Sequence, residues 1–278
     1  MSSSAPTAKS FILDMLLAAE GRPLSARDAI VACSVFSISE NSVRVALARL
    51  SSSSMLEAAG RGAYRLGPRA MELAGDVATW RSAEQRMRPW QGGYIAVHSG
   101  ALGRSDRSAL RQRSRALDML GFRELDRGLY VRPDNIEDSV DTVRHRLQVL
   151  GLEREAVVFL ASGFDAERNA QIPKLWNGKA LDASYRQQRQ QMESWLKQAD
   201  ELEPDVAARE SFLLGGRGIR QVVFDPLLPA PLVDVAERHA FVEAVHQFDQ
   251  AGRVIWQRFF EHSTGQPAAH LQDSRPVH

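Results

Sequence analysis

The sequence contains one cysteine, Cys33, among its 278 residues. A single thiol can form neither an internal disulfide nor a metal site that needs several cysteines. Long apolar runs are also missing, because Asp14 interrupts the stretch from Phe11 to Ala19, so no segment is expected to span a membrane. The opening Met-Ser-Ser-Ser lacks a cationic leader before an apolar core, which argues against export. These absences predict a cytoplasmic protein.

Signatures of catalysis are absent as well. The sequence has no P-loop, no G-x-G-x-x-G after a strand, no G-x-S-x-G and no H-E-x-x-H. His239, His246 and His262 fall on one expected helix, but their spacing does not suit a metal site. We therefore expect a protein that is not an enzyme, with no catalytic residues, no metal and no cofactor.

Charge is nearly balanced over the whole chain but not locally. The formal net charge is +1, and the hydrophobic (44%) and charged (25%) fractions are those of a soluble globular protein with two or three domains. Between residues 38 and 69, however, five arginines stand against only two glutamates. Because basic clusters attract phosphate, this local excess favours a nucleic-acid surface there.

The same segment has the pattern of an amphipathic helix from Ser39 to Ser52. Ser39 is suited to cap its N-terminus. Apolar residues at i, i+3, i+4 and i+7 form one face, beginning at Val43 and ending at Leu50. The opposite face has short polar and small residues with arginines at its edges, which suits a helix that enters the major groove of DNA.

A short hairpin is expected after this helix, with Gly60-Arg61-Gly62 at its turn. In a winged helix such a turn places a cation beside the phosphate backbone. We expect base contacts from Asn41, Ser42, Val45 and Arg49, and phosphate contacts from Arg44, Arg61 and Arg65. The alternative is a three-helix module that serves dimerisation and carries a surface hairpin.

Two more helices complete this N-terminal module. Phe11, Met15 and Ala19 lie on one apolar stripe that ends before Gly21-Arg22-Pro23. Ser25 can cap a second helix. The sequence thus predicts a winged helix-turn-helix over roughly residues 10–66, followed by a linker helix from Pro68 to about Arg88.

From Tyr94 onward strands and helices alternate. The expected elements are a strand at 94–98, a helix capped by Ser105, a hairpin across Asp126-Arg127-Gly128, a helix at 136–150 and a strand at 156–161. This β-α-β-β-α-β order is that of a ferredoxin-like unit.

The last region is expected to be helical. It comprises helices at 179–203, 206–214 and 235–261, a flexible loop at 215–218, and a rigid proline-rich connector at 225–231.

A second arginine cluster lies at residues 104–115. Its members are Arg104, Arg107, Arg111, Arg113 and Arg115. Three interpretations stay open, namely a solvated helix face, a contact with phosphate, and a pocket for an anionic ligand.

Three stretches resemble the PaaX family of bacterial transcriptional repressors, which control phenylacetate catabolism. One is the helix at 39–50. Another is Leu120-Gly121-Phe122 followed by residues 128–133. The third comprises Leu175-Trp176, Tyr185-Arg186 and the segment Phe224-Asp225-Pro226-Leu227-Leu228-Pro229. The likeness covers residues 10–262. The chain departs from the family in the serine run at 51–54 and in its short wing.

The resemblance implies an α+β protein with a winged helix-turn-helix, a ferredoxin-like domain similar to Cas2, and a helical C-terminal domain. We assign these to residues 10–88, 89–170 and 171–262, between disordered ends at 1–9 and 263–278. The resemblance also implies a homodimer that occupies a palindromic double-stranded operator and is released by a CoA thioester such as phenylacetyl-CoA.

An effector of that kind needs cations for its phosphates and aromatic walls for its acyl group. By residue type, the candidates are Trp90, Trp176, Tyr185, Trp195, Arg217 and Arg220. Core packing is the alternative role for the tryptophans.

Two other functions are alternatives for this sequence. A non-DNA-binding sensor or scaffold could use the winged helix for protein contacts. A metal-dependent nuclease of the Cas2 type would carry an aspartate at the end of its first strand, where this sequence has His98-Ser99-Gly100. That substitution argues against nuclease activity, and His98 is expected to be packed or hydrogen-bonded.

Overall fold

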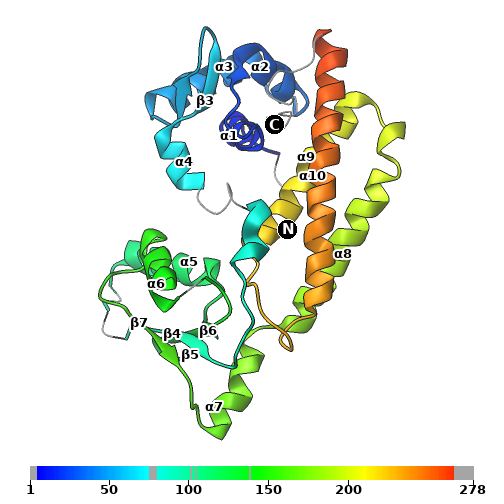
Figure 1. Ribbon diagram of the computed structural model, residues 1–278. Helices are drawn as coiled ribbons and strands as arrows, with labels where there is room; N and C mark the ends of the chain where they lie inside the picture. Colours follow the sequence, from blue (N-terminus) through cyan, green and yellow to red (C-terminus); the bar gives the residue numbers. More distant parts are fainter. Residues whose placement is uncertain (1–4, 75–79, 101, 104, 138, 266–278) are drawn as a thin grey trace, which may run out of the picture. The chain divides into compact units, whose positions relative to one another are not determined.

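The computed structural model describes residues 5–74, 80–100, 102–103, 105–137 and 139–265. The chain is an α/β protein that is mainly helical and contains two antiparallel sheets (Figure 1). It divides into two compact units. Unit 1 comprises residues 1–79, 191–217 and 245–278, and unit 2 comprises residues 80–190 and 218–244.

Unit 1 begins with three helices and a small sheet. The helices are α1 (Ala8–Ala18), α2 (Ala26–Ser34) and α3 (Glu40–Ser52). The strands are β1 (Leu24–Ser25), β2 (Leu56–Ala58) and β3 (Ala63–Leu66), in the order β1-β3-β2. The expected caps form, since Ser25 accepts a hydrogen bond from the Asp28 amide and Ser39 accepts one from the Ser42 amide. The two-residue strand β1 was not anticipated from the sequence.

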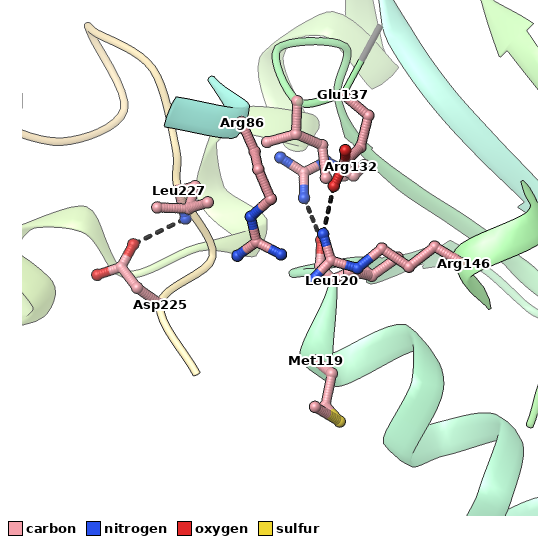
Figure 2. Close-up of a pocket in the computed structure, with 9 residues that line it drawn as sticks. Arg86, Met119, Leu120, Arg132, Glu137, Arg146, Asp225 and Leu227 are labelled. Carbon is pink, nitrogen blue, oxygen red and sulfur yellow. Dashed lines mark hydrogen bonds and ion pairs between the residues drawn. The ribbon is translucent and has the colours of Figure 1, made fainter. Parts of the chain in front are cut away.

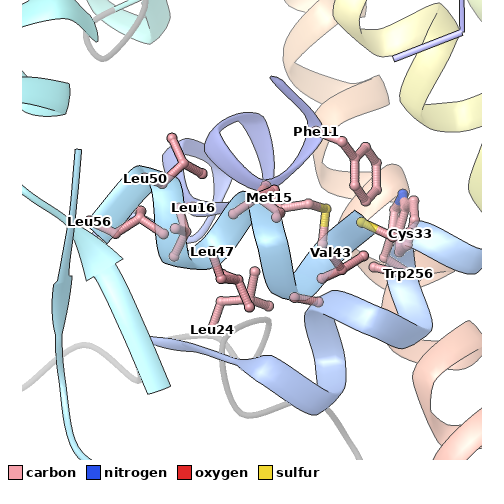
Figure 3. Packing of buried hydrophobic residues seen from close by; sticks show 14 of the residues in the cluster. Phe11, Met15, Leu16, Leu24, Cys33, Val43, Leu47, Leu50, Leu56 and Trp256 are labelled. Atoms are coloured by element: carbon pink, nitrogen blue, oxygen red, sulfur yellow. The ribbon is translucent and has the colours of Figure 1, made fainter. Parts of the chain in front are cut away.

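One apolar core holds these elements together (Figure 3). Phe11 and Leu16 of α1, Val43 of α3 and Leu56 of β2 are all buried in it. Trp256, on the last helix of the chain, belongs to the same core and packs against Phe11 with ring centroids 5.9 Å apart. Burial of such large side chains contributes about 1.5–3 kcal/mol each, so the small sheet depends on this shared core for its stability.

The expected linker helix differs from the structure. Helix α4 is described over Pro68–Ala74, and 3₁₀ turns rather than an α-helix occupy Trp80–Arg86 (η2). The intervening residues 75–79 lie outside the described part of the chain.

Unit 2 contains a four-stranded antiparallel sheet. Its strands are β4 (Tyr94–His98), β5 (Arg123–Asp126), β6 (Leu129–Pro133) and β7 (Val157–Ala161), in the order β5-β6-β4-β7. Helices α5 (Arg107–Met119) and α6 (Val140–Val149) cover one face (Figure 1). On that face, Ile95 and Val97 of β4 share a core with Leu117 of α5 and Val143 of α6.

Two details in unit 2 correct the expectation. Asp106, rather than Ser105, caps α5, because its carboxylate accepts hydrogen bonds from the amides of Ser108 and Ala109. His98, the last residue of β4, is exposed rather than packed, and its hydrogen-bonded role stays a prediction.

The remaining elements are helical. They are α7 (Ala166–Gln171), η3 (Ile172–Leu175), α8 (Gly178–Leu196), η4 (Ala199–Glu201), α9 (Pro204–Val223) and α10 (Val235–Thr264). Helices α8, α9 and α10 each contribute residues to both units. The division into three domains predicted from the sequence stays a prediction, as do the disordered ends, most of which lie outside the described residues.

The prediction of a flexible loop at residues 215–218 is wrong, because α9 continues through these residues without a break. The ring of Phe248 lies 3.4 Å from where a Cβ of Gly215 would stand. A glycine there allows close packing of α9 against α10, and this tertiary contact outweighs the low helix propensity of glycine.

No helix among the described residues is both long and apolar enough to cross a membrane.

Candidate functional site

The candidate site is built on α3, which has one buried face and one open face. Val43 and Leu47 are fully or almost fully buried in the core of unit 1. Asn41, Ser42, Arg44, Val45 and Arg49 are all exposed, as the helical periodicity predicted.

Val45 is the informative member of this open face, because an aliphatic side chain gains nothing from water. It is 41% exposed. A branched apolar side chain among short polar residues suits contact with a thymine methyl group in the major groove. Ser42 is partly committed to the helix itself, since its hydroxyl lies 2.9 Å from that of Ser39.

The hairpin after α3 carries Arg61 at its turn. Strands β2 and β3 pair in the antiparallel register Leu56↔Leu66 to Ala58↔Tyr64, as expected. The amide of Ala26, the first residue of α2, donates a 2.8 Å hydrogen bond to the Gly62 carbonyl and so ties the turn to the helical core. Arg61 itself is exposed.

The cations of this surface fall into two classes. Arg44 is paired with Glu40 one helical turn away, and Arg65 is paired with Glu57 directly across the hairpin, each at 2.5 Å. Arg49 and Arg61 have no ion pair with any described residue. The two uncompensated guanidinium groups are therefore the stronger candidates for contact with an anion.

The aromatic effector candidates have partners within the protein. Trp90 donates to the Gly93 carbonyl and Trp176 to the Gly121 carbonyl. The other two are also donors, with Tyr185 bonded to Asp225 and Trp195 to Glu210.

The cationic candidates, Arg217 and Arg220, are exposed on α9. Trp195 and Arg217 belong to unit 1, and the other four candidates belong to unit 2. None of the six lines the small cavity beside Arg132 or the larger pocket beside Arg127. The effector assignment therefore stays a prediction.

Two of the three stretches that carry the family resemblance, those after residue 119, meet in unit 2. The Arg132 guanidinium is fully buried and donates to the Leu120 carbonyl (Figure 2). It also donates to the Pro226 carbonyl. Gly121 has a φ of +73°, and a Cβ there would stand 2.8 Å from the Cβ of Pro226. Only glycine allows both this backbone conformation and this close approach.

Asn135 adds a further bond to the same connector, since its amide nitrogen donates to the Leu227 carbonyl at 2.7 Å. It also accepts from Arg132 at 3.0 Å. Burial lowers the pKa of Arg132 to about 9, which leaves the guanidinium charged at neutral pH. Because a buried cation costs several kcal/mol unless it is well bonded, these carbonyl contacts make Arg132 a structural residue.

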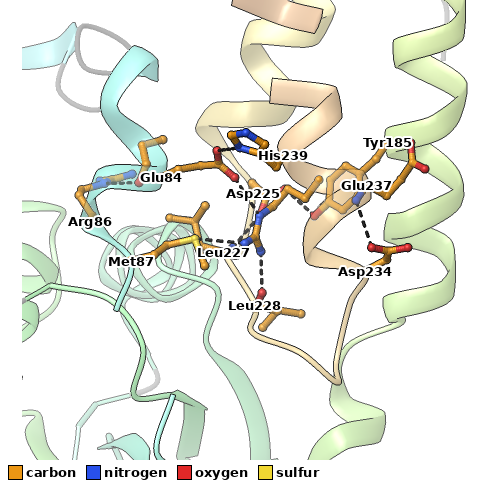
Figure 4. A network of polar contacts seen from close by, with 12 residues as sticks. Glu84, Arg86, Met87, Tyr185, Asp225, Leu227, Leu228, Asp234, Glu237 and His239 are labelled. Carbon is orange, nitrogen blue, oxygen red and sulfur yellow. Dashed lines mark hydrogen bonds and ion pairs between the residues drawn. The ribbon is translucent and has the colours of Figure 1, made fainter. Parts of the chain in front are cut away.

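A second polar network holds the same connector through Asp225 and Leu228 (Figure 4). Tyr185 donates to the Asp225 carboxylate at 2.5 Å, and the Leu227 amide donates to its other oxygen at 2.7 Å. Burial raises the pKa of Asp225. Arg238 of α10 donates to the Leu228 carbonyl at 2.5 Å and contacts Glu84 of η2.

The small cavity between these two networks, drawn in Figure 2, has a volume of about 10 Å³, enough for one water molecule. No group of three or more His, Cys, Asp or Glu side chains in the described ranges could hold a metal ion. The bonds of the two networks hold the backbone of the connector in place.

Sequence reasoning missed Asn135, Arg238 and Glu84 in these networks. Asn135 and Arg238 were overlooked because a buried polar residue follows no hydrophobic periodicity, and Glu84 is a half-buried residue of η2 with no motif beside it. Asn135 lies just after the motif at 128–133, and this proximity was the one available signal.

Comparison with known proteins adds a family match and a fold match. Residues 176–258 match the model of the PaaX-like protein C-terminal domain. No curated protein matches the sequence. The solved structure of the uncharacterized protein Rv0674 from Mycobacterium tuberculosis is similar, with a TM-score of 0.63 and 22% sequence identity, and the match covers 91% of this chain and 98% of that one. At that identity the likeness concerns the fold alone.

The matched residues include Trp176, Tyr185 and the connector at 225–229, which the structure brings together in unit 2. The resemblance inferred from the sequence is therefore confirmed for this region, and residues 176–258 of the chain are similar to the PaaX-like protein C-terminal domain.

Proposed function

We propose that the chain is a sequence-specific DNA-binding transcriptional repressor of an aromatic-acid catabolic operon. The observation that carries the proposal is the open face of α3, where Asn41, Val45 and Arg49 are exposed opposite a buried apolar face. A PaaX-like C-terminal domain suggests a regulator, in agreement with this surface.

The order of the elements along the chain supports a winged helix-turn-helix followed by a ferredoxin-like domain. Three helices followed by a hairpin, with α3 capped and half-exposed, suit a winged helix-turn-helix. The order β4-α5-β5-β6-α6-β7, with β6 and β4 at the centre of the sheet, suits a ferredoxin-like, Cas2-like domain. The helices after residue 171 would form the third domain.

In the proposed mechanism, α3 enters the major groove while Arg61 contacts the backbone. Asn41, Ser42, Val45 and Arg49 face base edges, and Arg44 and Arg65 reach phosphate by exchanging their glutamate partners for it. A homodimer in the cytoplasm would place two such helices on a palindromic operator.

Release would follow from a CoA-thioester effector such as phenylacetyl-CoA that prefers a dimer unable to span both half-sites. The effector can weaken DNA binding only by its preference between the two states. A hundredfold release requires about 2.7 kcal/mol of such coupling, which two charge-assisted hydrogen bonds can supply.

The test is a mobility-shift titration with the DNA upstream of the gene, using Arg49→Ala and Arg61→Ala. Arg49→Ala should cost about 1–3 kcal/mol on the operator and relax one base position. Arg61→Ala should weaken every sequence alike and reduce the salt dependence. Equal effects of both variants on all DNA would refute this division of roles, and a wild-type protein that shifts no DNA would favour the sensor or scaffold.

A further inference from the structure

A second pocket in unit 2 lies at the end of β4, where α5 and the β5–β6 turn meet. Its volume is about 380 Å³, within the range of small-molecule sites. It is lined by Ser99, Gly100, Leu110, Arg113, Ser114, Glu124, Arg127, Gly128 and Tyr130. The proposed DNA surface and the six effector candidates contribute none of these residues.

The pocket wall is fixed by backbone contacts. The Ser99 amide donates to the Gly128 carbonyl at 2.7 Å, and the Gly128 amide donates to Glu124 at 2.9 Å. Gly128 has a φ of +78°, and a Cβ there would stand 3.0 Å from the Cα of Gly100. The two loops are therefore held against each other, and the hollow beside them is preformed.

The two arginines that line the pocket differ in whether they can bind a ligand. Arg113 is buried and already makes a bidentate pair with Glu153, at 3.0 and 2.5 Å, and a third bond to the Gly103 carbonyl. It therefore acts as a wall of the pocket. Arg127 is exposed at the turn and has no ion pair with any residue in the described ranges. Arg127 is thus the cation that a ligand can engage.

Two further arginines of α5 do not line the pocket but share a side of the helix with a residue that does. Arg107 and Arg111 lie seven and three residues before the pocket residue Ser114 on α5, so all three share one side of the helix. Both guanidinium groups are exposed, and neither is ion-paired within the part of the chain that the structure describes. Together with Arg127 they outnumber the one carboxylate that lines the pocket, Glu124.

We propose that this pocket binds a small organic anion, whose charged group is held by Arg127 and whose uncharged part lies against Leu110 and Tyr130. The hydroxyl of Ser114 supplies a neutral hydrogen-bond partner. A concave pocket with one free cation in its lining and two on the same side of α5 suits a small ligand better than a duplex, which needs a continuous convex or groove-filling surface. Phosphate esters and carboxylates share this chemistry.

The experiment is an NMR titration of the ¹⁵N-labelled full chain with inorganic phosphate, acetate and chloride at equal ionic strength. The amide resonances of Ser99 and Gly128 should shift saturably with phosphate or acetate, with a dissociation constant on the order of 1 mM, and should not shift with chloride. The phosphate and acetate arms distinguish the two anion types.

Two variants and one control locate the effect. Arg127→Ala should weaken binding about tenfold, and Ser114→Trp should abolish it by filling the pocket while Arg127 remains. Arg115→Ala, which removes an exposed cation of the same helix that does not line the pocket, should leave binding unchanged. Unchanged melting curves would show that both pocket variants are folded.

The proposal is overturned if neither anion shifts these amides, or if Arg127→Ala binds like the wild type. It is also overturned if Arg127→Ala weakens duplex DNA as strongly as Arg61→Ala does, because the surface would then be a DNA contact. Since the anion titration contains no DNA, its outcome is independent of whether the proposed repressor function holds.

Discussion

At the scale of single residues, the proposed DNA surface depends on which arginines are already neutralised. Arg44 and Arg65 are each paired with a glutamate, and the carboxylates of these glutamates repel phosphate. The Glu40–Arg44 pair was predictable, since the two residues are four apart on a helix. The Glu57–Arg65 pair depends on hairpin register, which the sequence indicates only through its turn.

The compensating glutamates give a testable consequence. Replacing Glu57→Gln frees Arg65, so the affinity for random-sequence duplex should rise about threefold and the salt slope should steepen by about one. Fluorescence anisotropy at several salt concentrations measures both quantities. Glu155→Gln, an exposed glutamate of unit 2, is the matched control and should change neither. Equal gains in the two variants would point to net charge alone.

His239 provides a pH-dependent contact in unit 2. The Glu84 carboxylate lies 2.9 Å from its ring nitrogen and raises the pKa of His239 above 6.5 (Figure 4). A raised histidine pKa stabilises the folded state fully below the unfolded-state pKa, and this stability is lost as pH rises through the folded-state pKa.

His239→Gln should therefore lower the free energy of unfolding at about pH 5.5 and have almost no effect at about pH 9. The loss should be only about 0.5 kcal/mol, because the imidazole is mostly exposed to solvent. Urea denaturation at the two pH values measures it. An equal loss at both would mean that packing, rather than charge, makes the contact.

At the scale of elements, hydrophobic periodicity located most helices and strands. Strand β4 was predicted over its observed range, and α3 and its cap were predicted because capping residue and apolar stripe agree. Residues 215–218 were misjudged because their glycines disfavour a helix locally, while packing on Phe248 favours one. Such tertiary effects cannot be derived from local propensity.

Helix α9 can be tested at Gly216, which is exposed and has nothing within 4 Å of an added Cβ. Gly216→Ala should stabilise the chain by about 0.5–1 kcal/mol, because alanine favours the helix. Gly216→Pro should destabilise it by about 3 kcal/mol, because proline breaks the hydrogen-bond ladder. Thermal unfolding measures both. If Gly216→Pro were as stable as the wild type, the segment would be a loop rather than a helix.

At the scale of the whole molecule, the sequence indicated which motifs carry the family resemblance, but not that several of them are bonded to one another in the fold. Leu120, Arg132, Tyr185 and the connector at 225–229 are far apart in the chain, yet they form one bonded region in unit 2. No single-sequence pattern encodes such convergence. Likewise, the sequence suggested three consecutive domains, while the C-terminal helices contribute residues to both observed units.

The central claim is that the open face of α3 reads DNA. Hydroxyl-radical footprinting of the DNA upstream of the gene tests it most directly, with wild type and Val45→Glu, which changes one exposed residue and places a carboxylate in the groove. We expect two protected half-sites whose centres lie about 34–36 Å apart, or a multiple of that distance, and their loss in the variant. Protection that persists unchanged in Val45→Glu would contradict the account.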